Sequence, residues 1–337
     1  MPTTVYFATN RQVTNASDPV RGYPPIIVPP SSSDQMTFGT AFVDGIDIAT
    51  NTQGTVSQIL NTNKGSFPPA TLADLSASGR DMLVFIHGFD NSFSDAITRA
   101  AFNREWLAAS GQPATDTTVI AFSWPSLGKL ISPPILQSDY LTDQSMARHS
   151  GIHLMEFLKI LSPIFRANAR RSTLLAHSMG NLALESGVEN WFLHGNQANK
   201  IFNVTLLAAA DCRYDSFDLP PPAGLSRLPD LSQRVSIFFS QIDDVLKLSM
   251  VVNFAKRLGQ DGPHNMADTT AFPRNIYTMV DCSSYRDYDF NLLTSHQYYR
   301  MSPSVRGIIA SDMGRDAQPS MMVASATPRS RQRRKTA

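Results

Sequence analysis

The chain has 337 residues, of which 42% are hydrophobic and 17% charged, and its formal net charge is +1. A chain of this length and composition can bury one large core or two modest ones. No internal repeat is visible, and the longest apolar runs, such as residues 82–86, have the length of a strand. The sequence therefore excludes a repeat architecture and predicts no membrane-spanning helix.

The small net charge hides an asymmetry along the chain. The last nine residues contain five basic and no acidic side chains, whereas the rest contains 24 basic and 28 acidic residues. Such a segment can contact a polyanion, either nucleic acid or an anionic membrane, but a solvated, disordered end is the simpler interpretation. We expect residues 317–337 to form a disordered tail, with at most weak polyanion contact and no specific nucleic-acid partner.

The first residues lack both the basic and the apolar region of a secretory signal, so we expect a cytoplasmic protein. The two cysteines, Cys212 and Cys282, each follow an Asp at the end of an apolar run. Without an export signal, two buried free thiols are favoured over a disulfide between them.

Two strand patterns precede residue 81, at residues 5–11 and 38–43, and a Pro- and Ser-rich loop separates them. They predict an N-terminal extension of the sheet within residues 1–80. Strands and helices then alternate, which is typical of an α/β fold with a mainly parallel, doubly wound sheet and helices on both faces. We expect residues 1–316 to form a single domain of this kind. The expected strands are 82–87, 119–123, 173–176, 201–208, 235–240 and 276–280, and the expected helices are 92–109, 143–161, 179–193 and 245–258.

A serine stands between two small residues where an apolar strand is expected to turn into a helix, in the sequence Ala176-His177-Ser178-Met179-Gly180. This pattern is typical of a nucleophile elbow, a turn so tight that the serine adopts a strained backbone conformation. Small residues two positions before and after the serine let the strand and the helix approach each other. The pattern predicts that Ser178 is the nucleophile of an acyl-transfer reaction.

A serine hydroxyl needs a base to take its proton, and an acid must hold that base in one tautomer. In folds with this elbow the acid follows the serine, and the histidine follows the acid. Asp243, in the turn after the strand at residues 235–240, is the favoured acid, and Asp244 is expected to cap the next helix. Asp211, at the end of the preceding strand, remains an alternative acid. His296, in a loop after the last strand, is the favoured base.

The other histidines are assigned no catalytic role. His264 lies in a sequence typical of a surface loop, and His177 points away from the nucleophile by strand alternation. His149 and His153 have the spacing of a zinc pair on a helix, but no third ligand accompanies them, so both are expected to face solvent. We expect neither a metal ion nor an organic cofactor.

The strand at residues 82–87 ends in His87-Gly88, where a glycine lets the backbone bend towards the nucleophile. The predicted oxyanion-hole donors are the backbone N–H groups of Phe89 and Met179, the latter at the start of a helix whose dipole favours negative charge. His87 would then brace the loop.

Two irregular, Pro-rich segments, residues 125–140 and 211–231, follow the C-terminal ends of expected strands. Long insertions at that edge usually cover or line a site. Trp124 and Leu127 are therefore expected to contact a hydrophobic acyl group, together with three apolar residues of the first segment: Leu130, Ile131 and Ile135.

Four stretches together resemble the α/β-hydrolase superfamily: residues 85–93 (FIHGFDNSF), 122–126 (FSWPS), 175–181 (LAHSMGN) and 295–298 (SHQY). More narrowly, they are similar to a bacterial branch of lipase- and esterase-like serine hydrolases of unknown function, which residues 7–11 (FATNR) also resemble. The resemblance runs from about residue 5 to about residue 310. It implies Ser178 as nucleophile, Asp243 as acid and His296 as base. The pair Asp211-Cys212 departs from the expected pattern.

We interpret the sequence as that of a serine hydrolase that cleaves carboxylic esters through a Ser-His-Asp triad and an acyl-enzyme intermediate. An acyltransferase or thioesterase with the same triad is the alternative among enzymes. A binding or scaffold module that kept the fold and lost turnover is the alternative outside them. The expected partner is a small-molecule or lipid-like ester.

Overall fold

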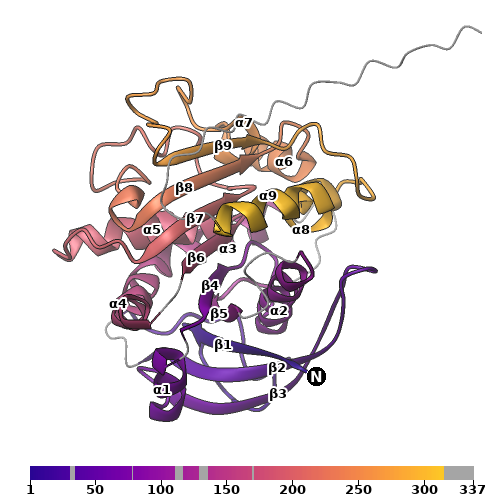
Figure 1. Ribbon diagram of the computed structural model, residues 1–337, viewed down its shortest axis with the longest axis vertical. Coiled ribbons are helices and arrows are strands. Elements are labelled where there is room, and N and C mark those ends of the chain that lie inside the picture. The colour runs from indigo at the N-terminus through magenta and orange to yellow at the C-terminus, as the bar shows by residue number, and fades with distance from the viewer. Residues whose placement is uncertain (31–34, 78, 111–116, 129–135, 169–170, 315–337) are drawn as a thin grey trace, which may run out of the picture.

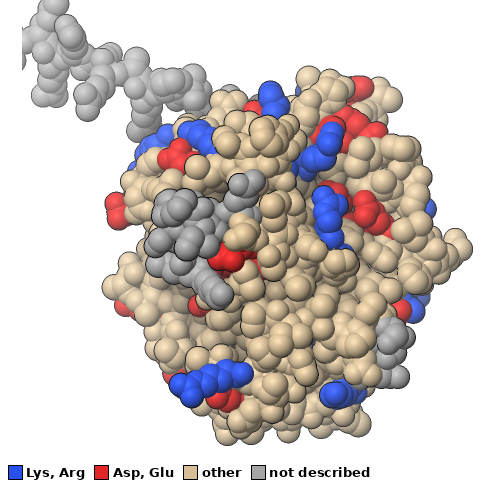
Figure 2. Space-filling view, turned by 180° about the vertical axis from the view of Figure 1, so that it is seen from behind, with Lys and Arg blue, Asp and Glu red and all other residues tan. Residues whose placement is uncertain are grey.

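A computed structural model describes residues 1–337 except 31–34, 78, 111–116, 129–135, 169–170 and 315–337. The expected C-terminal tail and Leu130, Ile131 and Ile135 therefore lie outside the described residues. Within the described part, none of the helices combines the length and the apolarity needed to cross a bilayer. On the face shown in Figure 2, the basic and acidic side chains are scattered in small groups among other residues.

The described residues form one nine-stranded sheet, with the strand order β3-β2-β1-β5-β4-β6-β7-β8-β9 (Figure 1). All neighbouring strands from β1 to β9 in this order pair in parallel. β2 and β3 add to one edge in antiparallel fashion. The expected mainly parallel sheet with an N-terminal extension is confirmed. The strands are β1 Thr3–Thr9, β2 Thr37–Asp47, β3 Thr52–Lys64, β4 Asp81–Ile86, β5 Thr117–Ser123, β6 Ser172–His177, β7 Phe202–Ala208, β8 Ser232–Phe239 and β9 Tyr277–Asp281.

Helices cover both faces of the sheet, as expected (Figure 1). The central strand β4 shows why, because all of its six residues are buried and successive side chains enter two different cores. Met82, Val84 and Ile86 join the core under α1, α4 and α5, while Leu83 and Phe85 join the core under α2 and α9. The helices are α1 Pro69–Ala77, α2 Phe93–Ala109, α3 Leu136–His149, α4 Gly151–Asn168, α5 Gly180–Leu193, α6 Asp244–Asn253, α7 Leu258–Asp261, α8 Tyr298–Met301 and α9 Pro303–Gly314.

Some elements differ from the sequence-based expectations. The expected helix at residues 143–161 is two helices, α3 and α4, and α3 begins within the segment predicted to be irregular. The two helices meet at Ser150-Gly151, where a Cβ atom on Gly151 would lie 2.3 Å from the hydroxyl of Ser186. The expected helix at residues 245–258 is also divided: α6 ends at Asn253, and the next residue, Phe254, adopts the left-handed conformation with φ of +51°.

Two elements of the N-terminal part, β3 and α1, were not predicted. Most side chains of β3 are exposed or half-buried, so its sequence has no strand-like alternation of apolar residues. It forms because its backbone pairs with β2 along nearly its whole length. The strand is the outermost of the sheet, and β2, β1 and β5 separate it from β4.

Candidate active site

Ser178 lies in a tight turn between β6 and α5, as the sequence predicts. Its φ is +54°, a left-handed conformation that is strained for a residue with a side chain. Its backbone N–H donates to the carbonyl of Ala208 at the end of β7, over 3.0 Å. A Cβ atom on Gly180 would lie 2.4 Å from the carbonyl oxygen of His87, so only glycine fits there. The turn thus holds the serine at the C-terminal edge of the sheet, between the ends of β4 and β7.

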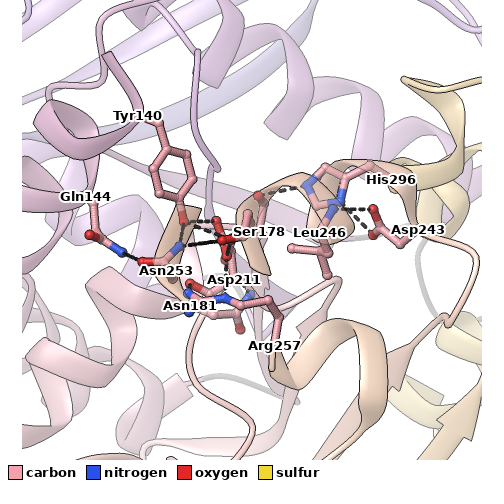
Figure 3. Close-up of polar contacts among 11 residues, drawn as sticks. Tyr140, Gln144, Ser178, Asn181, Asp211, Asp243, Leu246, Asn253, Arg257 and His296 are labelled. Carbon is pink, nitrogen blue, oxygen red and sulfur yellow. Dashed lines mark hydrogen bonds and ion pairs between the residues drawn. The ribbon is translucent and has the colours of Figure 1, made fainter. Parts of the chain in front are cut away.

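His296 lies between Ser178 and Asp243 and contacts both (Figure 3). Its Nε2 is 2.8 Å from the Ser178 Oγ, and its Nδ1 is 2.7 Å from the Asp243 Oδ2. An ionised carboxylate only accepts hydrogen bonds, so it places the imidazole proton on Nδ1 and leaves Nε2 free to accept the serine proton. All three side chains are buried. The structure therefore brings together the three residues that the sequence selected for the triad.

Asp243 owes its orientation to the helix that it begins. Its Oδ1 accepts a hydrogen bond from the backbone N–H of Leu246 over 2.9 Å, so Asp243 is the N-cap of α6. The expectation that Asp244 caps this helix is wrong: Asp244 is the first helical residue, and its N–H donates to the Ser295 hydroxyl over 3.1 Å. One oxygen of Asp243 is thus held by the helix while the other faces His296.

Asp211, the alternative acid, is committed to other partners (Figure 3). Its Oδ1 accepts from Arg257 Nε over 2.8 Å and from the Ser249 hydroxyl over 2.5 Å, and its Oδ2 accepts from the Tyr140 hydroxyl over 2.9 Å. Asp211 and Arg257 are both about 3% exposed, so they form a buried ion pair. None of the described contacts of the Asp211 carboxylate is with His296.

The loop after β4 lies against the nucleophile at the position expected for an oxyanion hole. A Cβ atom on Gly88 would lie 2.7 Å from the Cβ of Ser178, so the glycine lets the loop approach. Among the described residues, neither the Phe89 nor the Met179 backbone N–H has a hydrogen-bond acceptor. Met179 is the N-cap of α5, where the helix dipole favours negative charge.

His87 braces this loop from behind. Its Nε2 is 3.1 Å from the carbonyl of Trp124, whose indole N–H donates to the carbonyl of His87 over 2.7 Å, and the two rings stack. Burial, and then the positive charge of Arg11, lower the pKa of His87 to about 3, so the ring is neutral. Trp124 has no exposed surface, and its ring packs on that of His87. Its contact with an acyl group stays a prediction. Leu127 is half-buried.

Residues 70–312 match the model of a protein family described as "Alpha/beta hydrolase of unknown function (DUF900)". The chain belongs to this family. It is an α/β-hydrolase, in agreement with the sheet order and with the turn at Ser178. No curated protein sequence matches the chain.

Several solved structures are distantly similar to this hydrolase. An esterase of Pyrobaculum calidifontis has a TM-score of 0.37 and 10% identity, over 90% of this chain and 86% of that chain. An esterase of Pyrococcus furiosus has a TM-score of 0.40 and 11% identity, over 84% of this chain and 87% of that chain. A peroxisomal α/β-hydrolase of Saccharomyces cerevisiae has a TM-score of 0.32 and 9% identity, over 97% of this chain and 92% of that chain.

The other histidines of the hydrolase have varied surroundings. His177 Nε2 is 3.1 Å from the carbonyl oxygen of His296, and burial lowers the pKa of His177 well below its usual value. His149 is exposed, as expected, and His264 is half-buried with its Nδ1 2.5 Å from the Asp218 carboxylate. The expectation that His153 faces solvent is wrong, because its ring is buried between Asn10 and the carbonyl of Pro29.

Within the described residues, no three His, Cys, Asp or Glu side chains are grouped so that they could hold a metal ion. Both cysteines, Cys212 and Cys282, are buried and free, as the sequence suggested.

Sequence reasoning missed two buried charged residues beside the site of this hydrolase, Arg11 and Asp143. Arg11 follows β1 by two residues, and Asp143 lies on α3. A charged residue at the C-terminal end of an apolar strand pattern was the available signal for Arg11, since such a residue stands at the same edge of the sheet as the nucleophile. Asp143 had no such signal, because the helix that carries it was predicted to begin only at that residue.

Proposed function

We propose that this α/β-hydrolase cleaves carboxylic esters, with Ser178 as nucleophile, His296 as general base and acid, and Asp243 as the acid that orients the histidine. The observation that carries the proposal is the continuous hydrogen-bonded path from the Ser178 hydroxyl through both ring nitrogens of His296 to Asp243. Such a path activates a hydroxyl that is otherwise a poor nucleophile.

In the proposed reaction, Ser178 Oγ attacks the ester carbonyl while His296 Nε2 takes the hydroxyl proton. His296 then gives this proton to the departing alcohol, and an acyl-enzyme remains on Ser178. A water molecule, deprotonated by the same Nε2, releases the acid and restores the serine. Asp243 stays ionised throughout and stabilises the imidazolium that forms in each half of the reaction.

The negative oxygen of each tetrahedral intermediate needs hydrogen-bond donors that the ground state does not use. We propose that the backbone N–H groups of Phe89 and Met179 supply them. Support comes from their lack of acceptors among the described residues and from the contact of Gly88 with Ser178. Fixed donors of this kind need no rearrangement during the reaction, so they favour the transition state over the bound ester.

The test is the Ser178→Ala variant, assayed with p-nitrophenyl esters of increasing acyl length and with a fluorophosphonate probe. Loss of the nucleophile is expected to lower kcat by about 10⁴ to 10⁶ and to abolish labelling. Ser236→Ala is the matched control, because Ser236 is also a buried serine but lies on β8 and bonds to Asp312. We expect this control to be labelled and to turn over ester. A Ser178→Ala protein that keeps more than about a tenth of the wild-type rate would refute the proposal.

A further inference from the structure

We propose that Arg11 and Asp143 are positioning residues that fix the loop of residues 88–91, so that the Phe89 N–H is held beside Ser178. Together with Ser126, which donates to Asp143 and accepts from the Asn91 N–H, we call these residues the loop clamp. The inference rests on the proposed function, because the loop matters for catalysis only if Ser178 is acylated. It also makes the N-terminal strand β1, which lies outside the family match at residues 70–312, part of the catalytic unit.

Arg11 reaches the loop from the end of β1. Because β1, β5 and β4 are parallel neighbours, their C-terminal ends meet at one edge of the sheet. The guanidinium extends across the end of β5, where Nε donates to the Ser123 hydroxyl over 3.2 Å. Its Nη2 then donates to the carbonyl of Asn91 over 2.8 Å. One side chain therefore fixes the far end of the 88–91 loop to two strands.

Asp143 holds the same loop from the other side, from helix α3. Its Oδ2 accepts from the backbone N–H of Asp90 over 3.3 Å and also from the Ser126 hydroxyl. Its Oδ1 accepts from the backbone N–H of Leu127 over 2.9 Å. The Ser126 oxygen in turn accepts from the backbone N–H of Asn91 over 3.0 Å. Asp143 and Ser126 thus fasten two consecutive backbone groups of the loop.

The loop itself has a conformation that needs such support. Asp90 has a φ of +57°, in the left-handed region that residues with a side chain rarely adopt. The Asn91 side chain donates to the carbonyls of Gly88 over 3.0 Å and of Phe89 over 2.6 Å, so these two carbonyls point back into the loop. The Phe89 ring packs edge-on against Tyr140 of α3. These contacts hold the peptide groups before and after Phe89, and they therefore fix the direction of the Phe89 N–H.

The burial of Arg11 indicates that the protein uses the hydrogen bonds of this side chain and not only its volume. Its side chain is about 1% exposed. Burial lowers the pKa of the guanidinium to about 9, despite the nearby negative charges of Asp143 and Asp95. An apolar side chain of similar volume would fill the same space without this desolvation penalty. What an apolar side chain cannot do is donate to Ser123 and Asn91 at once, which the planar guanidinium does.

The test compares Arg11→Met, Arg11→Lys and Ser126→Ala with the wild-type full chain. Each protein is assayed for kcat and KM on one p-nitrophenyl ester, for the rate of fluorophosphonate labelling, and for the Ki of a trifluoromethyl ketone. The ketone forms a hemiketal with Ser178, whose negative oxygen requires the same donors as the transition state. Thermal unfolding is measured in parallel, so that turnover is compared only for folded protein.

For Arg11→Met we expect kcat to fall by about 10- to 100-fold with KM nearly unchanged, because a displaced donor weakens only the transition state. The Ki of the ketone should rise by the same factor as kcat/KM falls. Arg11→Lys should recover part of the activity, since one ammonium can reach one of the two acceptors. Ser126→Ala, which removes a single hydroxyl group, should show a weaker loss of the same kind.

Arg234→Met is the matched control. Arg234 is also largely buried, and it donates to the carboxylate and the carbonyl of Asp312. It lies near the start of β8, at the edge of the sheet opposite to Ser178. This variant should lose thermal stability while kcat stays within about two-fold of the wild type, because it displaces no group at the site.

The clamp is overturned if folded Arg11→Met and Ser126→Ala both keep the wild-type kcat and the wild-type Ki for the ketone. It is also overturned if KM alone changes. If Arg11→Met fails to fold, the kcat, KM and ketone Ki of Arg11→Lys and Ser126→Ala test the clamp in its place. If the wild-type protein reacts with neither ester nor fluorophosphonate, the proposed function fails and the clamp fails with it. A reactive wild type with equally reactive variants refutes the clamp alone.

Discussion

Gly88 lies directly against Ser178: a Cβ atom on Gly88 would stand 2.7 Å from the Cβ of Ser178 and 3.1 Å from the carbonyl oxygen of His177. This contact joins the loop after β4 to the turn after β6, on two adjacent parallel strands. Real side chains do not approach so closely, so a residue larger than glycine would force the two segments apart. The distance between the Phe89 N–H and the nucleophile therefore depends on this glycine as well as on the loop clamp.

We predict that Gly88→Ala lowers both activity and stability. The added methyl group must displace the loop or the elbow, which should destabilise the fold by about 1–3 kcal/mol. A displacement of about 1 Å should lower kcat on a p-nitrophenyl ester by about 100-fold. Denaturant unfolding and ester kinetics measure the two effects. The control is Gly307→Ala in α9, where a Cβ atom would meet nothing within 4 Å, so activity should not change. A fully active Gly88→Ala protein would contradict the close contact.

We predict that changing Asp243 to asparagine lowers mainly kcat, whereas changing Asp211 to asparagine lowers mainly the stability. Asp243→Asn should lower kcat by about 10⁴, because the amide no longer holds His296 in the required tautomer. It should change stability little, since the amide oxygen can still accept the Leu246 N–H that Asp243 caps. Kinetics of the folded variant provide the measurement.

Asp211→Asn should mainly destabilise the protein. The change leaves the buried guanidinium of Arg257 without its counter-ion, which should cost about 3–5 kcal/mol of unfolding free energy. The folded fraction should retain most of the wild-type kcat. Stability is followed by denaturant titration and kcat under conditions in which the variant is folded. If Asp211→Asn proves the more damaging change to kcat, then Asp211 and not Asp243 is the acid of the triad.

We predict that kcat/KM rises with pH through a single ionisation, because His296 must be neutral to accept the proton of Ser178. The two other histidines near the loop and the elbow do not contribute. Burial lowers the pKa of His87 to about 3 and holds the pKa of His177 well below its usual value, so both are already neutral. The profile is measured with one p-nitrophenyl ester from about pH 5 to about pH 8. A flat profile would remove His296 from its assigned role, and a second ionisation would show that another group also affects kcat/KM.

The same buried histidines predict that the fold is sensitive to acid. The folded-state pKa of His87 is about 3, below the value of about 6.5 for a free histidine. Between these values the unfolded chain binds a proton that the folded protein does not, so stability rises with pH and is lost as pH falls below about 6.5. The limiting slope is about 1.4 kcal/mol per pH unit for each such histidine.

Denaturant unfolding at about pH 7, 6 and 5 measures this slope, and His87→Gln supplies the comparison because glutamine does not titrate. We expect His87→Gln to be less stable than the wild type at neutral pH, because it loses the stacking on Trp124. Its stability should nevertheless depend less steeply on pH. Equal slopes for the two proteins would show that His87 takes up a proton in the folded state.

The sequence alone determined the succession of the central strands and helices along the chain and the position of the tight turn at Ser178. β4 and β6 are short and wholly buried, and each has an apolar run at its centre. Ser92 caps α2 through residues of its first turn. Both features depend on residues close together in the sequence. The elbow needs small residues at fixed spacing around Ser178, which is also a local requirement. The position of the acid was narrowed only to Asp243 or Asp211, because both follow buried strands.

Only the tertiary structure decided what each of these carboxylates contacts. Asp243 meets His296, 53 residues later, whereas Asp211 meets Tyr140, 71 residues earlier, and no local pattern encodes either contact. The same reason explains the unpredicted elements: β3 is a strand through its pairing with β2, and His153 is buried because Asn10 and Pro29 fold over it. Arg11 acquires its place beside the loop only when β1 inserts between β2 and β5. Periodicity and spacing describe a chain's own neighbours, whereas partners distant in sequence are brought together by the burial of whole elements against one another.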